Sequence, residues 1–257
     1  MSQRRPCRLG HISFMYQQRF YRDWTRDSDL VSFNATVRET DLYVQARRNL
    51  RRKTVRGISK FREVLEGYIE HHPGFLTALK PIEVGEDAPQ IVKAMAEAAA
   101  VAGVGPMASV AGVMAEYVGY DLLPFSREVI VENGGDIFLK VLEKRVIGLY
   151  AGDASPFTGK LALEVRPEET PLGVCTSSGT VGHSLSFGRA DACVVLSRST
   201  ALADATATAM GNIIASADDI PRGLEFAKGI GGLKGAVIII DDRIGIWGET
   251  RIVSVGE

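Results

Sequence analysis

The chain has 257 residues, of which 46% are hydrophobic and 24% are charged, and its formal net charge is −1. This composition excludes a disordered or fibrous protein and is typical of a globular protein with a sizeable core. We expect one domain over residues 1–257. Within it, residues 1–50 form a basic, β-rich part, residues 51–120 are mainly helical, and residues 121–257 are β-rich with helices near 200–215 and 219–229.

The amino-terminal part carries most of the positive charge. Residues 1–60 contain fourteen Lys or Arg against five Asp or Glu. This surplus indicates either a solvated face with an oligomer contact or an attraction for nucleotide phosphates, with Arg19 and Arg22 as the best candidates. Hydrophobic alternation in residues 12–24, 30–37 and 42–44 predicts an antiparallel meander, so we expect no nucleic-acid partner.

Helical periodicity follows the meander. Apolar residues from Ile58 to Ile69 predict an amphipathic helix that ends at Pro73. Pro89 marks the start of an alanine-rich helix that runs to Gly103. After the glycine and proline break, a further helix is expected over about 107–118, with its first amides free to meet an anion.

The run from 98 to 115 contains eighteen uncharged residues, which is close to the length of a membrane span. Gly103, Gly105 and Pro106 interrupt it, and its many alanines give it little hydrophobicity. The sequence therefore predicts a buried helix pair and no membrane partner.

The second half alternates strands with two helices. Residues 129–132 and 137–140 flank Asn133-Gly134-Gly135-Asp136, which is either a hairpin turn or a strand end built for close backbone approach. Further strands are expected at 146–150, 161–165, 173–176 and 192–196, followed by a helix at 200–215, a helix capped at Asp218 or Asp219, and a terminal hairpin of 235–240 with 244–247.

Three cysteines, Cys7, Cys175 and Cys193, show no paired spacing. Structural zinc is not expected, and the sparse count with no apolar leader indicates the cytoplasm. Cys175 is either a small buried residue or a reactive thiol.

Three motifs supply the groups that a diphosphate and Mg²⁺ need. The first is the glycine turn ending in Asp136, and the second is the hydroxyl-rich run Thr176-Ser177-Ser178-Gly179, with His183 after it. In the third, Asp204 and Thr208 lie four residues apart, on one face of a helix. Each group also has a structural reading, because Asp and Thr cap helices and turns and a histidine can bond a turn carbonyl.

Together these motifs resemble the ApbE flavin transferase superfamily, and residues 103–211 look like its branch of small cytoplasmic ApbE-like proteins. The resemblance implies an α+β, T-fold-related fold of mixed or antiparallel sheets packed with helices. It implies Mg²⁺ held by Asp204 and Thr208, FAD or a related nucleotide as cofactor, and catalytic roles for Asp204 and His183. The residues expected to contact the cofactor are Gly103, Gly105, Pro106, Met107, Asn133, Gly134, Gly135, Asp136, Thr176, Ser177, Ser178 and Gly179.

The chain departs from the family at residues 103–111, where a Gly-x-Ala-Lys-Gly-x-x-x-Asp segment has lost its lysine and aspartate. The activities that the resemblance implies therefore stay open. The first is FMN transfer from FAD to a threonine of an acceptor protein, and the second is a non-catalytic accessory or carrier role in anaerobic sulfur assimilation or redox metabolism. The third is hydrolysis of the FAD pyrophosphate. Exposed strand edges also suggest a homodimer.

Overall fold

An antiparallel sheet forms the centre of the molecule. The computed structural model describes residues 29–179 and 188–255. Within them the main sheet has eight strands in the order β1-β2-β3-β4-β7-β8-β9-β10, and every neighbouring pair is antiparallel. The strands are β1 (Val31–Val37), β2 (Thr40–Ala46), β3 (Val129–Asn133), β4 (Asp136–Lys140), β7 (Leu172–Ser177), β8 (Ala192–Ser197), β9 (Leu233–Ile240) and β10 (Arg243–Gly248).

Burial along the strands follows their place in the sheet. Edge strand β1 alternates between exposed and buried residues, as a strand with one covered face does. Every residue of the inner strand β8 is buried, and its sequence Ala-Cys-Val-Val-Leu-Ser is almost wholly apolar. Both faces of the sheet are therefore covered at β8.

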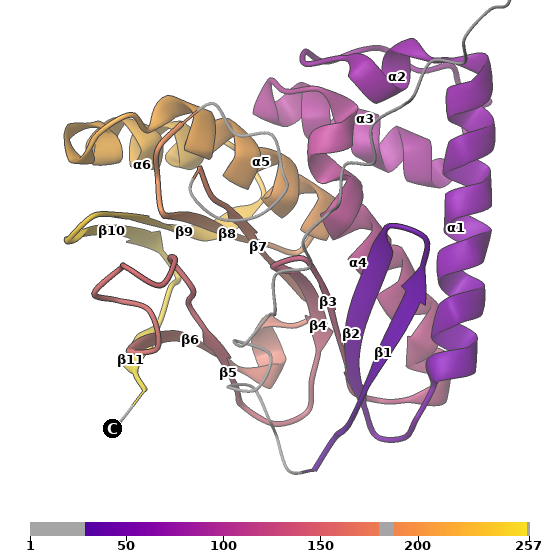
Figure 1. Ribbon diagram of the computed structural model, residues 1–257, viewed down its shortest axis with the longest axis horizontal. Helices are drawn as coiled ribbons and strands as arrows, with labels where there is room; N and C mark the ends of the chain where they lie inside the picture. Colours follow the sequence, from indigo (N-terminus) through magenta and orange to yellow (C-terminus); the bar gives the residue numbers. More distant parts are fainter. Residues whose placement is uncertain (1–28, 180–187, 256–257) are drawn as a thin grey trace, which may run out of the picture.

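One face is covered by helices (Figure 1). They are α1 (Arg51–His71), α2 (Gly74–Thr77), α3 (Gln90–Ala102), α4 (Val110–Leu122), α5 (Thr200–Ile213) and α6 (Ile220–Lys228). Apolar residues of α1, α3 and α4 form one core with β1 to β4, and α5 and α6 form another with β7 to β10. Short 3-10 turns include η2 (Pro106–Ser109), η3 (Leu123–Phe125), η4 (Pro167–Glu169) and η5 (Ala217–Asp219).

A small second sheet lies against the opposite face. It consists of β11 (Ile252–Ser254), β6 (Leu161–Val165) and β5 (Arg145–Gly148), in that order. Leu163 and Ile147 of this sheet share a core with Val174, Val194 and residues of β4 and β9. The predicted hairpin of 235–240 with 244–247 is confirmed by the pairing of β9 with β10. It is not the last element, because β11 follows it and pairs with β6.

The helical prediction is confirmed for α1, α3 and α5, but the segment after Gly103 differs from it. Gly103 ends α3 in the left-handed conformation, at φ 75°, which a glycine adopts without strain. The next helix begins as the 3-10 turn η2 at Pro106 and becomes α-helical only from Val110. The α+β class, with antiparallel sheets and helices, is confirmed.

No single helix of residues 29–179 and 188–255 has both the length and the apolar composition of a membrane span. Two consecutive helical segments, 90–102 and 106–125, have them only when taken together, and the chain bends by 103° between them. Both segments are built into the core, where Met95, Ala99, Val113 and Val118 are completely buried. This burial agrees with the predicted buried helix pair.

Candidate functional site

The glycine motif forms a two-residue hairpin between β3 and β4. Asn133 pairs with Asp136, and Gly134 and Gly135 between them have φ values of 67° and 108°, a conformation that glycine tolerates and other residues rarely adopt. Of the two structures predicted for residues 133–136, the hairpin turn is therefore confirmed. Strand alternation places Asp136 on the same side as Phe138, which packs in the helix-covered core.

The polar side chains of this hairpin hold neighbouring backbone. The Asn133 Nδ2 donates to the Ala111 carbonyl oxygen at 3.0 Å, and the Thr176 N–H donates to Asp136 Oδ1 at 3.3 Å. Because Ala111 lies at the start of α4 and Thr176 near the end of β7, the hairpin joins three segments that are far apart in the sequence.

Asp204 lies on α5, in contact with the start of α4. Its Oδ2 accepts a hydrogen bond of 2.7 Å from the Gly112 N–H, and the residue is only 8% exposed. A Cβ at position 112 would lie 2.7 Å from the Asp204 Cβ, so only glycine fits here. The first amides of α4, which were expected to be free for an anion, are therefore directed at this carboxylate.

The two carboxylates influence each other. Burial raises the pKa of Asp136 to about 7, although hydrogen bonds from the Cys175 thiol and the Thr176 N–H lower it. Burial, and next the charge of Asp136, raises the pKa of Asp204 well above its usual range. Within the residues that the structure describes, no Lys or Arg bonds to either carboxylate. Two buried acids without a cationic partner favour uptake of a proton or a cation.

The hydroxyl-rich motif begins with the last two residues of β7, where the Thr176 N–H bonds to Asp136, and continues past the strand. Ser177 is 5% exposed, and its Oγ has no hydrogen-bond partner among the described residues. Gly179 N–H donates to the Ala190 carbonyl oxygen at 2.9 Å, and Ser178 is half-buried. An unsatisfied buried hydroxyl is unusual and leaves a group free for a ligand.

Cys175 interacts with both acids but is no reactive thiol. It is completely buried, and its Sγ donates to the Thr200 carbonyl oxygen at 3.4 Å. Burial, with the carboxylates of Asp136, Asp204 and Glu116, raises its pKa well above the usual range. Since the thiolate is the nucleophilic form, the structure favours the small buried residue of the two predicted alternatives.

The segment at 103–107 mainly turns the chain. Gly105 lies so close to Ala78 that a Cβ there would be 1.7 Å from the Ala78 carbonyl oxygen, and Pro106 opens η2. Met107 is partly buried against the core. The hydrogen bonds of Gly103 and Gly105 are local. A role for Gly103, Gly105, Pro106 and Met107 in ligand binding stays a prediction.

Thr208 lies one turn beyond Asp204 on α5 and is half-buried. His183 falls in 180–187, outside the described residues, and so do Cys7, Arg19 and Arg22. In the described parts, 29–179 and 188–255, no three His, Cys, Asp or Glu residues gather as metal ligands. A bound cation would therefore need hydroxyl, backbone or ligand oxygens besides the carboxylates.

Two residues of the site were not predicted, Gly112 and Glu116. Glu116 Oε2 accepts hydrogen bonds from the N–H groups of Thr200, at 2.8 Å, and Ala201, at 3.2 Å, and so anchors the start of α5. Its partners lie more than eighty residues away in the sequence, at separations of 84 and 85. No local pattern could reveal such a contact.

A family model described as "AbpE bacteria" matches residues 22–229, and the chain belongs to this family. A UPF0280 protein of Methanocaldococcus jannaschii is 46% identical over 197 residues, which cover 75% of this chain and 80% of that protein. A UPF0280 protein of Methanopyrus kandleri is 39% identical over 233 residues, with coverages of 88% and 94%.

Among solved structures, the apo form of the flavinyl transferase ApbE from Pseudomonas stutzeri is similar in fold. Its TM-score is 0.50 at 14% identity, and the match covers 88% of this chain and 94% of that one. At this identity the likeness concerns the fold alone.

Proposed function

We propose that the protein binds FAD or a related nucleotide diphosphate together with Mg²⁺, between the β3–β4 hairpin, the end of β7 and α5, and that it transfers FMN to a threonine of an acceptor protein. The observation that carries the proposal is the pair of buried carboxylates, Asp136 and Asp204, which no basic side chain of the described residues neutralises. Membership of the ApbE-like family supports the same ligand.

The groups present fit a hard cation. Mg²⁺ prefers oxygen ligands, usually one or two carboxylates completed by water and phosphate oxygens. Asp204 would be the first ligand, with Thr208 one turn further along α5 and Asp136 facing it. The Ser177 Oγ, which has no hydrogen-bond partner among the described residues, would bond to a ligand oxygen. When bound, the cation would offset the charge of the diphosphate.

The chain's own residues have separate tasks in this proposal. The Gly112 N–H fixes the Asp204 carboxylate, and the Thr176 N–H fixes Asp136. The transfer breaks the phosphoanhydride bond of FAD, joins the FMN phosphorus to the threonine Oγ and releases AMP. The threonine hydroxyl must lose its proton, and the Asp136 carboxylate would accept it. His183 stays the alternative acceptor of this proton.

Calorimetric titration of FAD into the full chain, with and without Mg²⁺, tests the binding step. We expect Mg²⁺-dependent binding that Asp204→Asn abolishes and that Asp218→Asn, a change at an exposed acid near α6, leaves intact. FAD binding that is equal in both variants and indifferent to Mg²⁺ would remove Asp204 from the site.

Product analysis separates the activities. FMN on the threonine of an acceptor, with AMP released, supports transfer. Release of both FMN and AMP without an acceptor indicates hydrolysis by water. Binding without turnover indicates an accessory or carrier role, which one observation favours: the first amides of α4 are directed at Asp204 and not left for a phosphate.

A further inference from the structure

The first turns of α1, together with Arg48 just before the helix, carry basic side chains whose charge is not compensated. We call these exposed residues the α1 basic patch: Arg48, Arg51, Arg52, Lys53 and Arg56. Among the residues that the structure describes, none of the five forms an ion pair. Further along α1 the situation differs, since Lys60 and Arg62 both pair with carboxylates. The uncompensated charge is thus confined to one end of the helix.

Neutral partners hold several of these side chains in place. Arg48 Nε donates to the Phe125 carbonyl oxygen at 2.9 Å, and Arg51 Nε donates to the Asn34 carbonyl oxygen at 3.0 Å. Lys53 Nζ lies 3.5 Å from the centre of the Phe125 ring. These contacts orient the cations without neutralising them, and each guanidinium keeps further N–H donors for a ligand.

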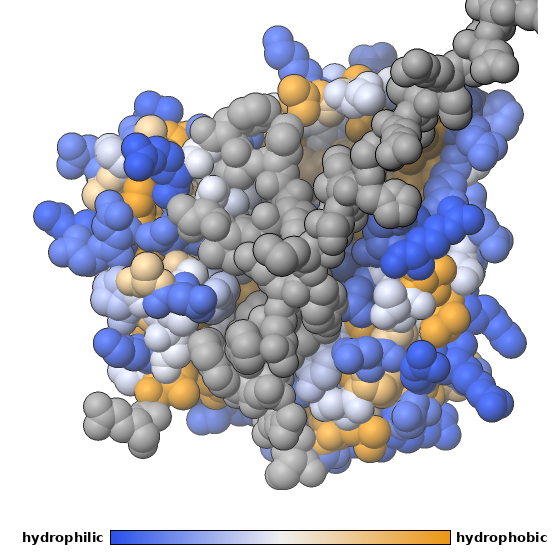
Figure 2. Space-filling model, viewed as in Figure 1, coloured by the Kyte–Doolittle hydropathy of each residue, from blue (hydrophilic) through white to orange (hydrophobic). Residues whose placement is uncertain are grey.

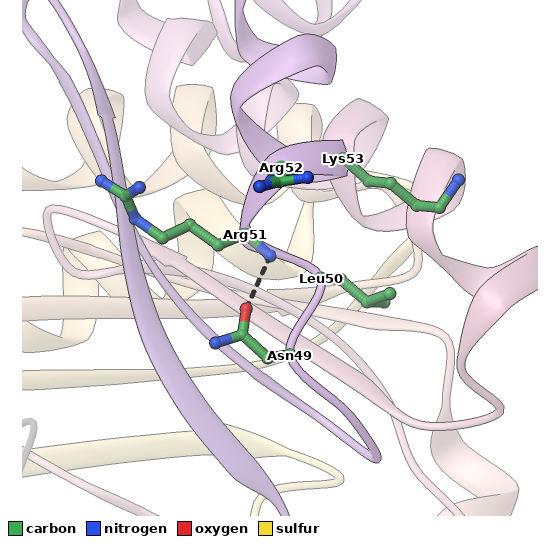
Figure 3. Close-up of a pocket in the computed structure, with 5 residues that line it drawn as sticks. All are labelled: Asn49, Leu50, Arg51, Arg52 and Lys53. Carbon is green, nitrogen blue, oxygen red and sulfur yellow. Dashed lines mark hydrogen bonds between the residues drawn. The ribbon is translucent and has the colours of Figure 1, made fainter.

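A cavity opens beside the patch. It has a volume of about 430 Å³ and is lined by Asn49, Leu50, Arg51, Arg52 and Lys53 (Figure 3). Asn49 Oδ1 accepts a hydrogen bond of 3.0 Å from the Arg51 N–H, which holds the chain at the cavity wall. Hydrophilic residues also project along the α1 edge in Figure 2. The volume is within the range of small-molecule sites.

The cavity is separate from the candidate site. The two lie at opposite ends of α4, since Gly112 near its start bonds to Asp204 while η3 after its end supplies Phe125 to the patch. A helix of 13 residues is about 20 Å long. A ligand in the cavity would therefore not reach Asp204.

We propose that the α1 basic patch binds a small, multiply charged phosphate anion, and that it does so without a divalent cation. Several uncompensated positive charges require several negative charges, and guanidinium groups bind phosphate oxygens through paired hydrogen bonds. The compact cavity favours a small anion over an extended polyanion, because the positive stretch ends where Lys60 is paired with Asp121.

The probe is inorganic pyrophosphate, titrated calorimetrically into the full chain with EDTA present, so that binding at the Mg²⁺ site is excluded. Arg52→Ala with Lys53→Ala is expected to weaken binding about tenfold or more, because two cations that line the cavity are lost. Arg222→Ala with Lys228→Ala removes the same charge from α6 and serves as the control. The control and Asp204→Asn should bind as the unchanged protein does.

Three results would overturn the proposal. The first is pyrophosphate binding that the patch variant leaves unchanged, and the second is no pyrophosphate binding by the unchanged protein. The third is an oligothymidylate that binds through the patch more tightly than pyrophosphate does, which would make the patch a surface for an extended polyanion. Loss of pyrophosphate binding in Asp204→Asn but not in the patch variant would assign the anion to the candidate site.

Discussion

Gly112 lies at a close approach of α4 to α5 in the site. A Cβ at this position would be 2.7 Å from the Asp204 Cβ and 2.7 Å from the Thr200 carbonyl oxygen. Neither is the flexible end of a side chain, so the two helices would have to move apart. The hydrogen bond that fixes Asp204 depends on their contact.

We expect Gly112→Ala to lower the free energy of unfolding by about 1–3 kcal/mol, the usual cost of overpacking a core, and to weaken Mg²⁺-dependent FAD binding. Urea denaturation measures the first effect and calorimetry the second. Gly67→Ala is the matched control, since nothing lies within 4 Å of its added Cβ in α1; it should raise stability by about 0.5–1 kcal/mol. Equal stability of both variants would contradict the close contact.

The sequence could predict the acids of the site but not what fixes them. Asp136 and Asp204 each belong to a recognisable motif, and both are buried and interact. Gly112, by contrast, lies in a run of small residues where nothing distinguishes it from its neighbours. Its importance comes from α5, which packs against it only in three dimensions.

At the scale of elements, α5 positions Asp204, and its start is capped twice. Ser199 Oγ accepts from the Leu202 N–H at 3.2 Å, and Glu116 of α4 accepts from Thr200 and Ala201. Three of the amides that a helix start leaves unpaired are therefore satisfied. Burial raises the pKa of Glu116, although the hydrogen bonds from Ala201 and Thr200 lower it. These hydrogen bonds therefore only partly offset the cost of removing the carboxylate from water.

Glu116→Ala should lower the free energy of unfolding by about 1–2 kcal/mol, because two amides at the start of α5 lose their acceptor. Glu116→Gln keeps an acceptor oxygen and should cost less. Glu97→Ala, at an exposed position of α3, should change stability by less than about 0.5 kcal/mol. Thermal or urea unfolding ranks the stability of the three variants. If Glu116→Ala were as stable as Glu97→Ala, the cap would be dispensable.

The elements that the sequence predicted best are those with a clear pattern. The strand 161–165 is found as predicted, and the helix after Pro89 runs from Gln90 to Ala102, with Gly103 as its C-cap. β11 has only three residues, Ile252–Ser254, too few for alternation to be visible. The 3-10 turn at Pro106 was missed because proline at a helix start does not distinguish the two helix types.

At the scale of the whole molecule, one ionic network joins the two sheets. Arg145 of β5 donates to Glu128 Oε1 at 3.0 Å and to Asp29 at 2.9 Å, and Arg47 also pairs with Glu128. Burial would raise the pKa of Glu128, but the Leu142 N–H and the Arg145 guanidinium outweigh it and lower this pKa below its usual range.

This network predicts a loss of stability in acid. The pKa of Glu128 is lower in the folded protein than in the unfolded chain. The ionised carboxylate therefore contributes fully to the free energy of unfolding above the unfolded pKa of about 4.3, and this contribution is lost as the pH falls through the folded pKa. Glu128→Gln should therefore cost about 3 kcal/mol at pH 7 and progressively less below about pH 4. Glu225→Gln, which breaks an exposed pair with Lys228, should cost less than about 1 kcal/mol. A Glu128→Gln penalty that does not depend on pH would refute the ionic role of this residue.

The most direct test of the account is Mn²⁺ binding, measured by electron paramagnetic resonance with FAD present, in the unchanged protein and in Asp204→Asn. The account predicts one bound Mn²⁺ per chain that requires FAD, that is lost in the variant, and that Mg²⁺ displaces. Equal Mn²⁺ binding by both proteins, or none by either, would contradict a cation site at the paired carboxylates.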